Sequence, residues 1–230
     1  MKKLILISFL LIKVILFSNQ IDSLQKFYKI ELTEPVNIDI EIDKISKSIE
    51  KGNFDYSIAL GEKLLNFKNV DFKNKAKIYS ELGVAYWYNG NTSKGNNYFF
   101  KSIEIAKIED DSLTLAKSYF NLGFTNLANG EYHSSLNNFF EAEKYCIDSN
   151  SIQKYKIKDY ISYCFIVQEK FDFAEQYVKE AFKISTKIND RTHFVNMSNS
   201  LGYYYLVSKK NRFSSVLFYK CAIYCYKNRL

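Results

Sequence analysis

The sequence predicts an all-α protein, an α-solenoid of about five helix–turn–helix repeats. Three observations predict this fold. The 230 residues include one Pro and 8 Gly, too few chain-breaking residues for a β-sandwich or barrel. Apolar residues make up 47% of the chain, enough to bury a core and to exclude an intrinsically disordered protein. A pattern of small and aromatic residues also recurs about every 40 residues.

The first residues are typical of a secretory signal peptide. Two lysines follow Met1, the stretch 4–17 is apolar apart from Ser8 and Lys13, and residues 18–20 are small or polar. We expect residues 1–18 to direct export to the periplasm or the medium. Lys13 and the absence of a small-residue cleavage motif leave open a membrane anchor or a short buried helix. No later stretch is apolar enough for a membrane span.

A leader is expected at 19–36, mobile over 19–34, ahead of a solenoid that covers 37–230. The only Pro, Pro35, lies near the end of the leader. Thr33 can cap a helix there, and Pro35 suits the first turn of that helix.

The repeats are marked by a small residue that follows Leu or Ile in the first half of each unit. It occurs at positions 83, 123, 162 and 202, with spacings of 40, 39 and 40 residues. A turn follows, for example Asn89-Gly90 or Asn129-Gly130, and then a second apolar stretch at helical spacing. The small residue should let the two helices of a unit approach closely, and the units must stack to bury their apolar faces. The expected helices are 37–50, 54–67, 73–89, 92–108, 112–129, 132–147, 152–169, 172–188, 191–209 and 213–228.

Three motifs carry a resemblance to a known family. They are Leu82-Gly83-x-x-Tyr86, the run from Gly130-Glu131-Tyr132 through Ser135 and Phe139 to Ala142, and Phe171-x-x-Ala174 with Ala181. Together they resemble the tetratricopeptide repeat (TPR) family, over residues 37–228. The period is nearer 40 than the usual ~34 residues, and no Pro closes each unit. The longer repeats are similar to the sensory repeat regions of bacterial TPR signalling proteins.

The charge of the chain argues against nucleic acid as a partner. The formal net charge is +7, but three of the lysines lie in the first 18 residues. Only three of the 32 basic residues are Arg, the side chain that sequence-specific readers of DNA favour. The remaining basic residues are spread along the chain rather than clustered, so no nucleic acid is expected.

Signatures of enzymes and cofactors are absent from the sequence. It contains no nucleophile elbow, phosphate-binding loop, zinc-protease motif or dinucleotide fingerprint. His133 and His193 have no Cys or Asp partners at catalytic spacing, and Glu109, Asp110 and Asp111 resemble solvated loop charges. We therefore expect a non-enzymatic protein without a cofactor or metal.

The four cysteines are expected to be small core residues. Cys221 and Cys225 stand at i and i+4 of one helix, a spacing poorly suited to a disulfide. Cys146 and Cys164 are remote from them in sequence. An oxidising compartment leaves the redox state of all four open.

Candidate binding residues follow from the resemblance, which implies that the first helix of each unit lines a concave groove. One position in these helices carries a lysine row, with Asn196 at the last unit, and a neighbouring position carries an aromatic row. Lysines suit acidic side chains or a terminal carboxylate, and aromatic residues are common binding anchors. The alternatives are solvated lysines and aromatic rings buried between helices. The predicted ligand-binding residues are Lys77, Lys117, Lys156, Asn121, Trp87, Phe124, Tyr163 and Tyr203.

The predicted function is a scaffold that binds a protein or peptide, acidic in character, in its concave groove. The alternative is the sensory region of a membrane regulator whose histidine kinase or helix-turn-helix output module is either missing or supplied by another chain. A cytoplasmic peptide-responsive regulator is a third reading, should residues 1–18 not be a signal. The apolar segment 213–230 also suits self-association.

Overall fold

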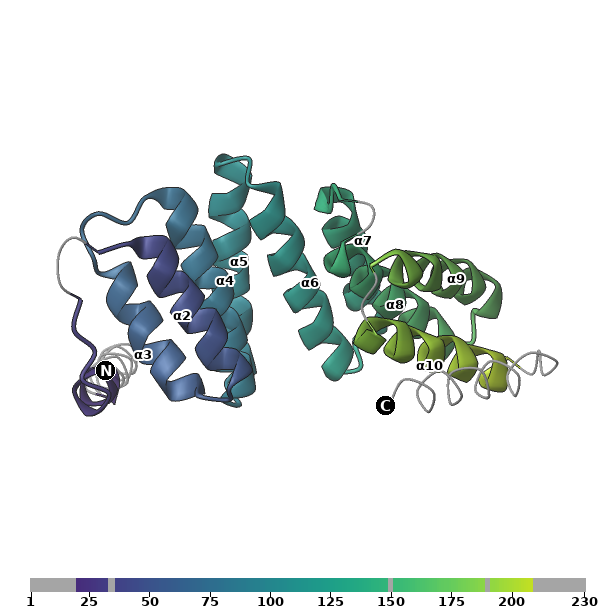
Figure 1. Ribbon diagram of the computed structural model, residues 1–230, viewed down its shortest axis with the longest axis horizontal. Helices are drawn as coiled ribbons and strands as arrows, with labels where there is room; N and C mark the ends of the chain where they lie inside the picture. Colours follow the sequence, from purple (N-terminus) through teal and green to yellow (C-terminus); the bar gives the residue numbers. More distant parts are fainter. Residues whose placement is uncertain (1–19, 33–35, 149–150, 189–190, 209–230) are drawn as a thin grey trace, which may run out of the picture. The chain divides into compact units, whose positions relative to one another are not determined.

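The computed structural model describes residues 20–32, 36–148, 151–188 and 191–208, with the side chains of 191–195 and 197 left aside. Residues 20–27 are helical. Where the structure describes the connection between two further helices, it is short (Figure 1). The helices are α2 (Ile38–Glu50), α3 (Phe54–Leu65), α4 (Phe72–Tyr88), α5 (Thr92–Ile108), α6 (Ser112–Ala128), α7 (Tyr132–Tyr145), α8 (Ile152–Val167), α9 (Phe171–Lys187) and α10 (Arg191–Val207).

The predicted all-α repeat fold is confirmed. Every expected helix from 37–50 to 191–209 is present, and its ends agree with the expectation to within two residues. The last expected helix, 213–228, lies outside the described residues, as do the expected signal segment and Pro35. No helix in the described part of the chain is both long and apolar enough to cross a membrane.

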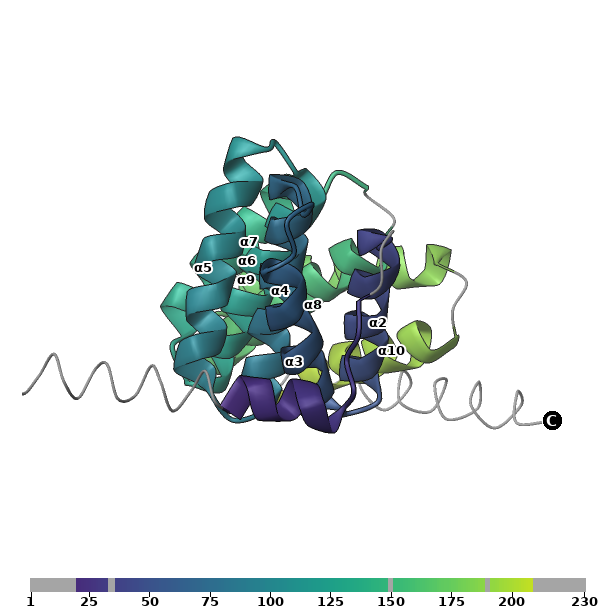
Figure 2. The same ribbon diagram turned by 90° about the vertical axis from the view of Figure 1, so that its left-hand side faces the viewer.

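Contacts divide the chain into two units, between Thr114 and Leu115. In unit 1, α2 packs on α3, α3 on α4, and α4 on α5, and these helices lie side by side (Figures 1 and 2). In unit 2, α8 contacts α7, α9 and α10. Each unit has its own apolar core.

The small repeat residue brings the helices of a pair together, as expected. A Cβ added at Gly83 would lie 2.4 Å from Cε1 of Phe99, and one added at Gly123 would lie 2.8 Å from Cδ1 of Phe139. Twelve residues after Gly123, the Ser135 hydroxyl donates to the Gly123 carbonyl at 2.8 Å. The spacing seen in the sequence therefore marks the points where helix backbones come closest.

The turns between paired helices share one geometry. The second residue after the first helix has a positive φ, +77° at Gly52, +84° at Gly90 and +77° at Gly130. Its amide and the next amide then bond back to the helix end, as in Asn91 N to Tyr86 O at 2.8 Å. Glu169 occupies the corresponding place in the fourth unit with φ +58°, where a side chain is less favourable than glycine. Glycine and asparagine in the sequence thus locate the first three turns, whereas the turn at Glu169 contains neither residue.

The segment ahead of α2 differs from the expected mobile leader. Ile21 and Ile30 are both buried in the core of unit 1. Gln25 also donates a hydrogen bond to the Ala59 carbonyl of α3 at 3.2 Å. Residues 20–32 are therefore packed against the first repeat, because Ile21 and Ile30 bury apolar surface that an extended leader would leave in water.

Candidate functional site

The predicted binding residues all lie on the first helices of repeats, but in two units. Lys77 and Trp87 are on α4 in unit 1. The other six are on α6, α8 and α10 in unit 2.

In unit 1 the lysine position is already neutralised. Lys77 Nζ lies 3.0 Å from Oδ1 of Asp39 on α2, and 3.1 Å from Oδ1 of Asn74. Trp87 is half-buried and packs edge-on against Tyr88, with ring centroids 4.7 Å apart. This group offers a partner less free charge than the sequence pattern implied.

In unit 2, α6 presents Lys117, Asn121 and Phe124 along one face, at helical spacings of four and three residues. All three side chains are half-buried. The Nδ2 amide of Asn121 is buried and finds no acceptor in the described part of the chain. Phe124 packs edge-on against Tyr160 of α8, at a centroid distance of 5.4 Å, which joins the faces of α6 and α8.

The matching faces of α8 and α10 are more open. Lys156 is exposed and forms no ion pair with a described residue. Tyr163 and Tyr203 occupy the same position in successive repeats, and each residue is 43% exposed. Of the two readings left open for the aromatic row, exposure holds for these two tyrosines and partial burial for Trp87 and Phe124.

Asp159 lies in the same face, and sequence reasoning missed it. It stands three residues after Lys156 and four before Tyr163, so all three share one side of α8. The Ser200 side chain of α10 is hydrogen-bonded to its carboxyl group. Burial raises the pKa of this carboxyl to about 6, and the Ser200 bond offsets only part of the rise. In the sequence, the feature that could have identified Asp159 is an acidic residue between the lysine and aromatic positions of one predicted helix.

Comparisons with known proteins agree with this architecture. No family model and no curated protein matches the sequence. The structure resembles BtubC (BKLC) from P. vanneervenii, with a TM-score of 0.74 and 15% identity over 93% of this chain and 90% of that one. It also resembles a putative kinesin light chain from Podosopora anserina with nearly identical TPR-like repeats (TM-score 0.68, 14% identity, 87% and 100% covered). MamA is a third neighbour (0.59, 19%, 84% and 96%).

The chain has a TPR-like fold. This confirms, for the fold, the resemblance drawn from the repeat motifs. The two units of the TPR-like chain hold further polar clusters.

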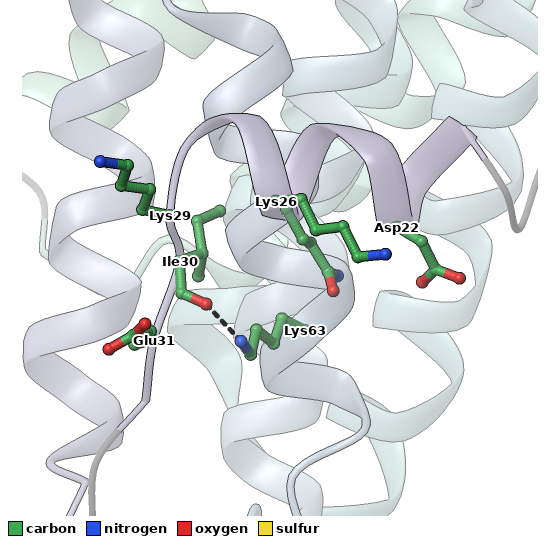
Figure 3. A pocket seen from close by; sticks show the side chains of 7 residues that line it. Asp22, Lys26, Lys29, Ile30, Glu31 and Lys63 are labelled. Atoms are coloured by element: carbon green, nitrogen blue, oxygen red, sulfur yellow. Dashed lines mark hydrogen bonds between the residues drawn. The ribbon is translucent and has the colours of Figure 1, made fainter.

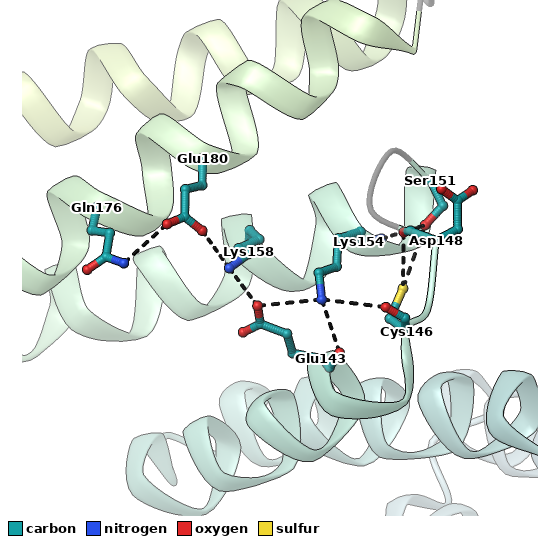
Figure 4. Close-up of polar contacts among 8 residues, drawn as sticks. All are labelled: Glu143, Cys146, Asp148, Ser151, Lys154, Lys158, Gln176 and Glu180. Carbon is teal, nitrogen blue, oxygen red and sulfur yellow. Dashed lines mark hydrogen bonds and ion pairs between the residues drawn. The ribbon is translucent and has the colours of Figure 1, made fainter.

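The first cluster lies in unit 2, between α7, α8 and α9 (Figure 4). Lys158 Nζ is 2.5 Å from carboxylate oxygens of both Glu143 and Glu180, and lies 4.9 Å from the ring centroid of Tyr177. Burial alone would lower the pKa of Lys158, but the hydrogen bonds to Glu143 and Glu180 raise it above its usual value. Lys154 also donates to the Glu143 carbonyl at 3.1 Å. These charges satisfy one another, so the cluster links three helices rather than offering a site.

The second cluster lies in unit 1 and joins α3, α4 and α5. Glu62 accepts hydrogen bonds from the hydroxyls of Tyr86 at 2.8 Å and Tyr98 at 2.6 Å. Lys94 donates to the Tyr86 hydroxyl at 2.8 Å and stands 3.6 Å from Glu62. Burial lowers the pKa of Lys94 to about 8, although Glu62 acts in the opposite direction. This network ties the three helices together through the Glu62 carboxylate.

A shallow cavity of about 380 Å³ lies where residues 20–32 meet α3 (Figure 3). Its charged lining includes Lys26, Lys29 and Lys63 beside Asp22 and Glu31. Lys63 donates to the Ile30 carbonyl and so ties this segment to α3. Because the lining mixes both signs of charge, it selects no single class of ligand.

The described residues also offer no metal site, since no three His, Cys, Asp or Glu side chains gather closely enough to hold an ion. Cys164 is buried and Cys146 half-buried, and both are free thiols. Burial raises the pKa of the Cys164 thiol, which makes it less reactive. Cys221 and Cys225 lie outside the described residues.

Proposed function

We propose that the chain is a non-enzymatic scaffold that binds a protein or peptide along the first-helix face of unit 2. This face, which we call the unit 2 groove face, comprises Lys117, Asn121, Phe124, Lys156, Asp159, Tyr163 and Tyr203. The observation that carries the proposal is the combination of the unpaired Asn121 amide and the exposed Lys156 with the exposed tyrosines Tyr163 and Tyr203 on this face.

The buried amide of Asn121 supports the proposal most directly. A buried donor without an acceptor costs about 1–3 kcal/mol, so such groups in folded proteins call for an explanation. Because the Asn121 residue is only half-buried, its side chain can turn toward the surface, where a carbonyl oxygen of an extended peptide can accept this hydrogen bond. The peptide would then satisfy a group that the free protein leaves unpaired.

The side chains around Asn121 suit the rest of such a ligand. Tyr163 and Tyr203 offer rigid, amphipathic contact area of the kind that dominates binding energies at interfaces. Lys156 supplies an exposed positive charge for an acidic side chain or a terminal carboxylate. A partner with acidic groups is thus part of the proposal, whereas Lys77 is left out because Asp39 already pairs with it.

Export through residues 1–18 remains part of the proposal, and so does self-association through 213–230. Both segments lie outside the described residues. The sensory-region alternative rests on the sequence resemblance, and nothing on the unit 2 groove face favours it over a scaffold.

Peptide binding with a charge-reversed groove face tests the proposal. The probe is an array of synthetic peptides of varied charge. We expect acidic peptides to bind the wild type, and Lys117→Glu combined with Lys156→Glu to weaken them by about tenfold or more. The matched control is Lys183→Glu with Lys187→Glu, two exposed lysines of α9 in the same unit.

The control should bind acidic peptides like the wild type. If no peptide binds the wild type, the proposed scaffold function is wrong. If both double variants lose binding equally, net charge and not the unit 2 groove face is responsible.

A further inference from the structure

We propose that the unit 2 groove face also holds a basic side chain of the bound peptide, with Asp159 as its counter-ion and Tyr163 and Tyr203 beside it. This rests on the proposed function and names a second recognition element within it. Sequence reasoning from the lysine row alone indicates only acidic partners.

The Asp159 carboxyl group is partly buried and has no cationic partner among the described residues. It is only partly exposed, and Ser200 is its hydrogen-bond partner across the α8–α10 contact. No described lysine, arginine or histidine forms an ion pair with it. A carboxylate withdrawn from water without a cation is unfavourable, and such groups are concentrated at functional sites.

The two exposed tyrosines lie within one helical turn of the Asp159–Ser200 pair in sequence, one on each helix. Tyr163 follows Asp159 by four residues, and Tyr203 follows Ser200 by three. In an α-helix a long side chain leans back over the preceding turn. Both rings therefore extend toward the turns that carry the carboxyl group and its hydrogen-bond partner, one from each helix.

An acid flanked by aromatic rings has a specific chemistry. The face of a tyrosine ring attracts a cation within about 6 Å of its centroid, and a carboxylate supplies the full opposite charge. Lysine, arginine and methylated lysine side chains present the required positive group. An acidic or neutral side chain gains from neither element.

Lys156 and Asp159 together fix which way round a charged peptide can bind. It precedes Asp159 by three residues, which is about 4.5 Å along the helix axis, yet it points its charge to solvent without pairing to Asp159. Lys156 therefore favours an acidic group on the ligand, and Asp159 a basic group one helical turn away. We infer that the partner is a peptide that carries both charges close together.

Matched peptides test this inference. Take peptides that bind the wild type and place lysine, arginine, trimethyllysine, norleucine or glutamate at each position in turn. At one position we expect a basic residue to bind about tenfold tighter than norleucine. Asp159→Asn, which keeps the Ser200 contact, should abolish that preference, while Asp172→Asn on α9 should keep it.

Two further variants separate binding from folding. Tyr163→Leu keeps an apolar group but removes the ring, so it should reduce the preference for basic over norleucine peptides while norleucine peptides still bind. Lys156→Gln should lower the affinity for acidic peptides and raise the affinity for basic ones. A folding defect would lower both affinities and so cannot produce changes of opposite sign. The thermal midpoint of each variant confirms that it is folded.

Three outcomes overturn the inference. They are equal binding of lysine and norleucine peptides at every position, a basic preference that survives Asp159→Asn, or a parallel loss of all peptides in Tyr163→Leu. Each leaves the scaffold function intact, because peptides still bind the wild type. Absence of any peptide binding overturns the scaffold function, and the basic site with it.

Discussion

At the scale of single residues, the closest helix contacts are made where the sequence has glycine. A methyl group at Gly83 would lie 2.4 Å from the Phe99 ring, much closer than side-chain atoms approach in folded proteins. We expect Gly83→Ala to destabilise the protein by about 1–2 kcal/mol. Overpacking lowers the free energy of unfolding by typically about 1–3 kcal/mol, and the better helix propensity of alanine offsets up to about 1 kcal/mol of this loss. Chemical denaturation of both proteins measures the difference.

A second substitution isolates the contact. Phe99→Leu makes room for the new methyl group, so Gly83→Ala should cost less in that background than in the wild type. If Gly83→Ala destabilises both backgrounds equally, contact with the Phe99 ring is not the reason that glycine is needed at position 83.

Residues of the candidate site were harder to predict than these glycines. A glycine is fixed by the backbone around it, so its spacing alone locates the helix contact. The pairing of Lys77 with Asp39 depends on two neighbouring helices lying in register, which a single row of lysines does not reveal. Asp159 was missed for the same reason, since its significance comes from Ser200 on another helix.

At the scale of helices, a buried network joins α3, α4 and α5 and makes stability depend on pH. Burial lowers the pKa of Lys94 from 10.5 to about 8. Between pH 8 and 10.5 the unfolded chain therefore holds a proton on this amine that the folded protein has released. Stability rises with pH wherever the unfolded state binds more protons, so Lys94 contributes a rise across this window.

Lys94→Gln removes this titration. We expect the stability of the wild type relative to Lys94→Gln to increase as the pH rises from 8 to 10, measured by denaturant unfolding at each pH. The window stops at 10 because Tyr86 and Tyr98 add the opposite trend above it. Burial raises the pKa of both phenols, so unfolded tyrosines ionise first. Parallel curves for the two proteins would show that Lys94 keeps its ordinary pKa.

The helices themselves were largely predictable, because the residues that begin and end them act over short distances along the sequence. Turn residues such as Gly90 and capping residues such as Asn91 act within a few positions, so the sequence places the helix ends to within two residues. The segment 20–32 was not predictable in this way. Its helix docks through Ile21 and Ile30 on a core formed by later residues, and no repeat motif marks it.

At the scale of the whole molecule, stability should vary from repeat to repeat. In a solenoid each repeat contacts only its neighbours, so a local defect loosens its own surroundings first. The two apolar cores lie in different units, one on each side of Thr114–Leu115.

We therefore expect Gly83→Ala to speed amide hydrogen exchange mainly in α3, α4 and α5. Exchange in α8 and α9 should remain close to that of the wild type. Gly123→Ala, whose methyl group would press on Phe139 in unit 2, should give the reverse pattern with faster exchange in α6 and α7. The same increase in every helix, from either variant, would instead show that the chain unfolds as one cooperative block. In that case a peptide bound to the unit 2 groove face would slow amide exchange in unit 1 as well, because both units would unfold together.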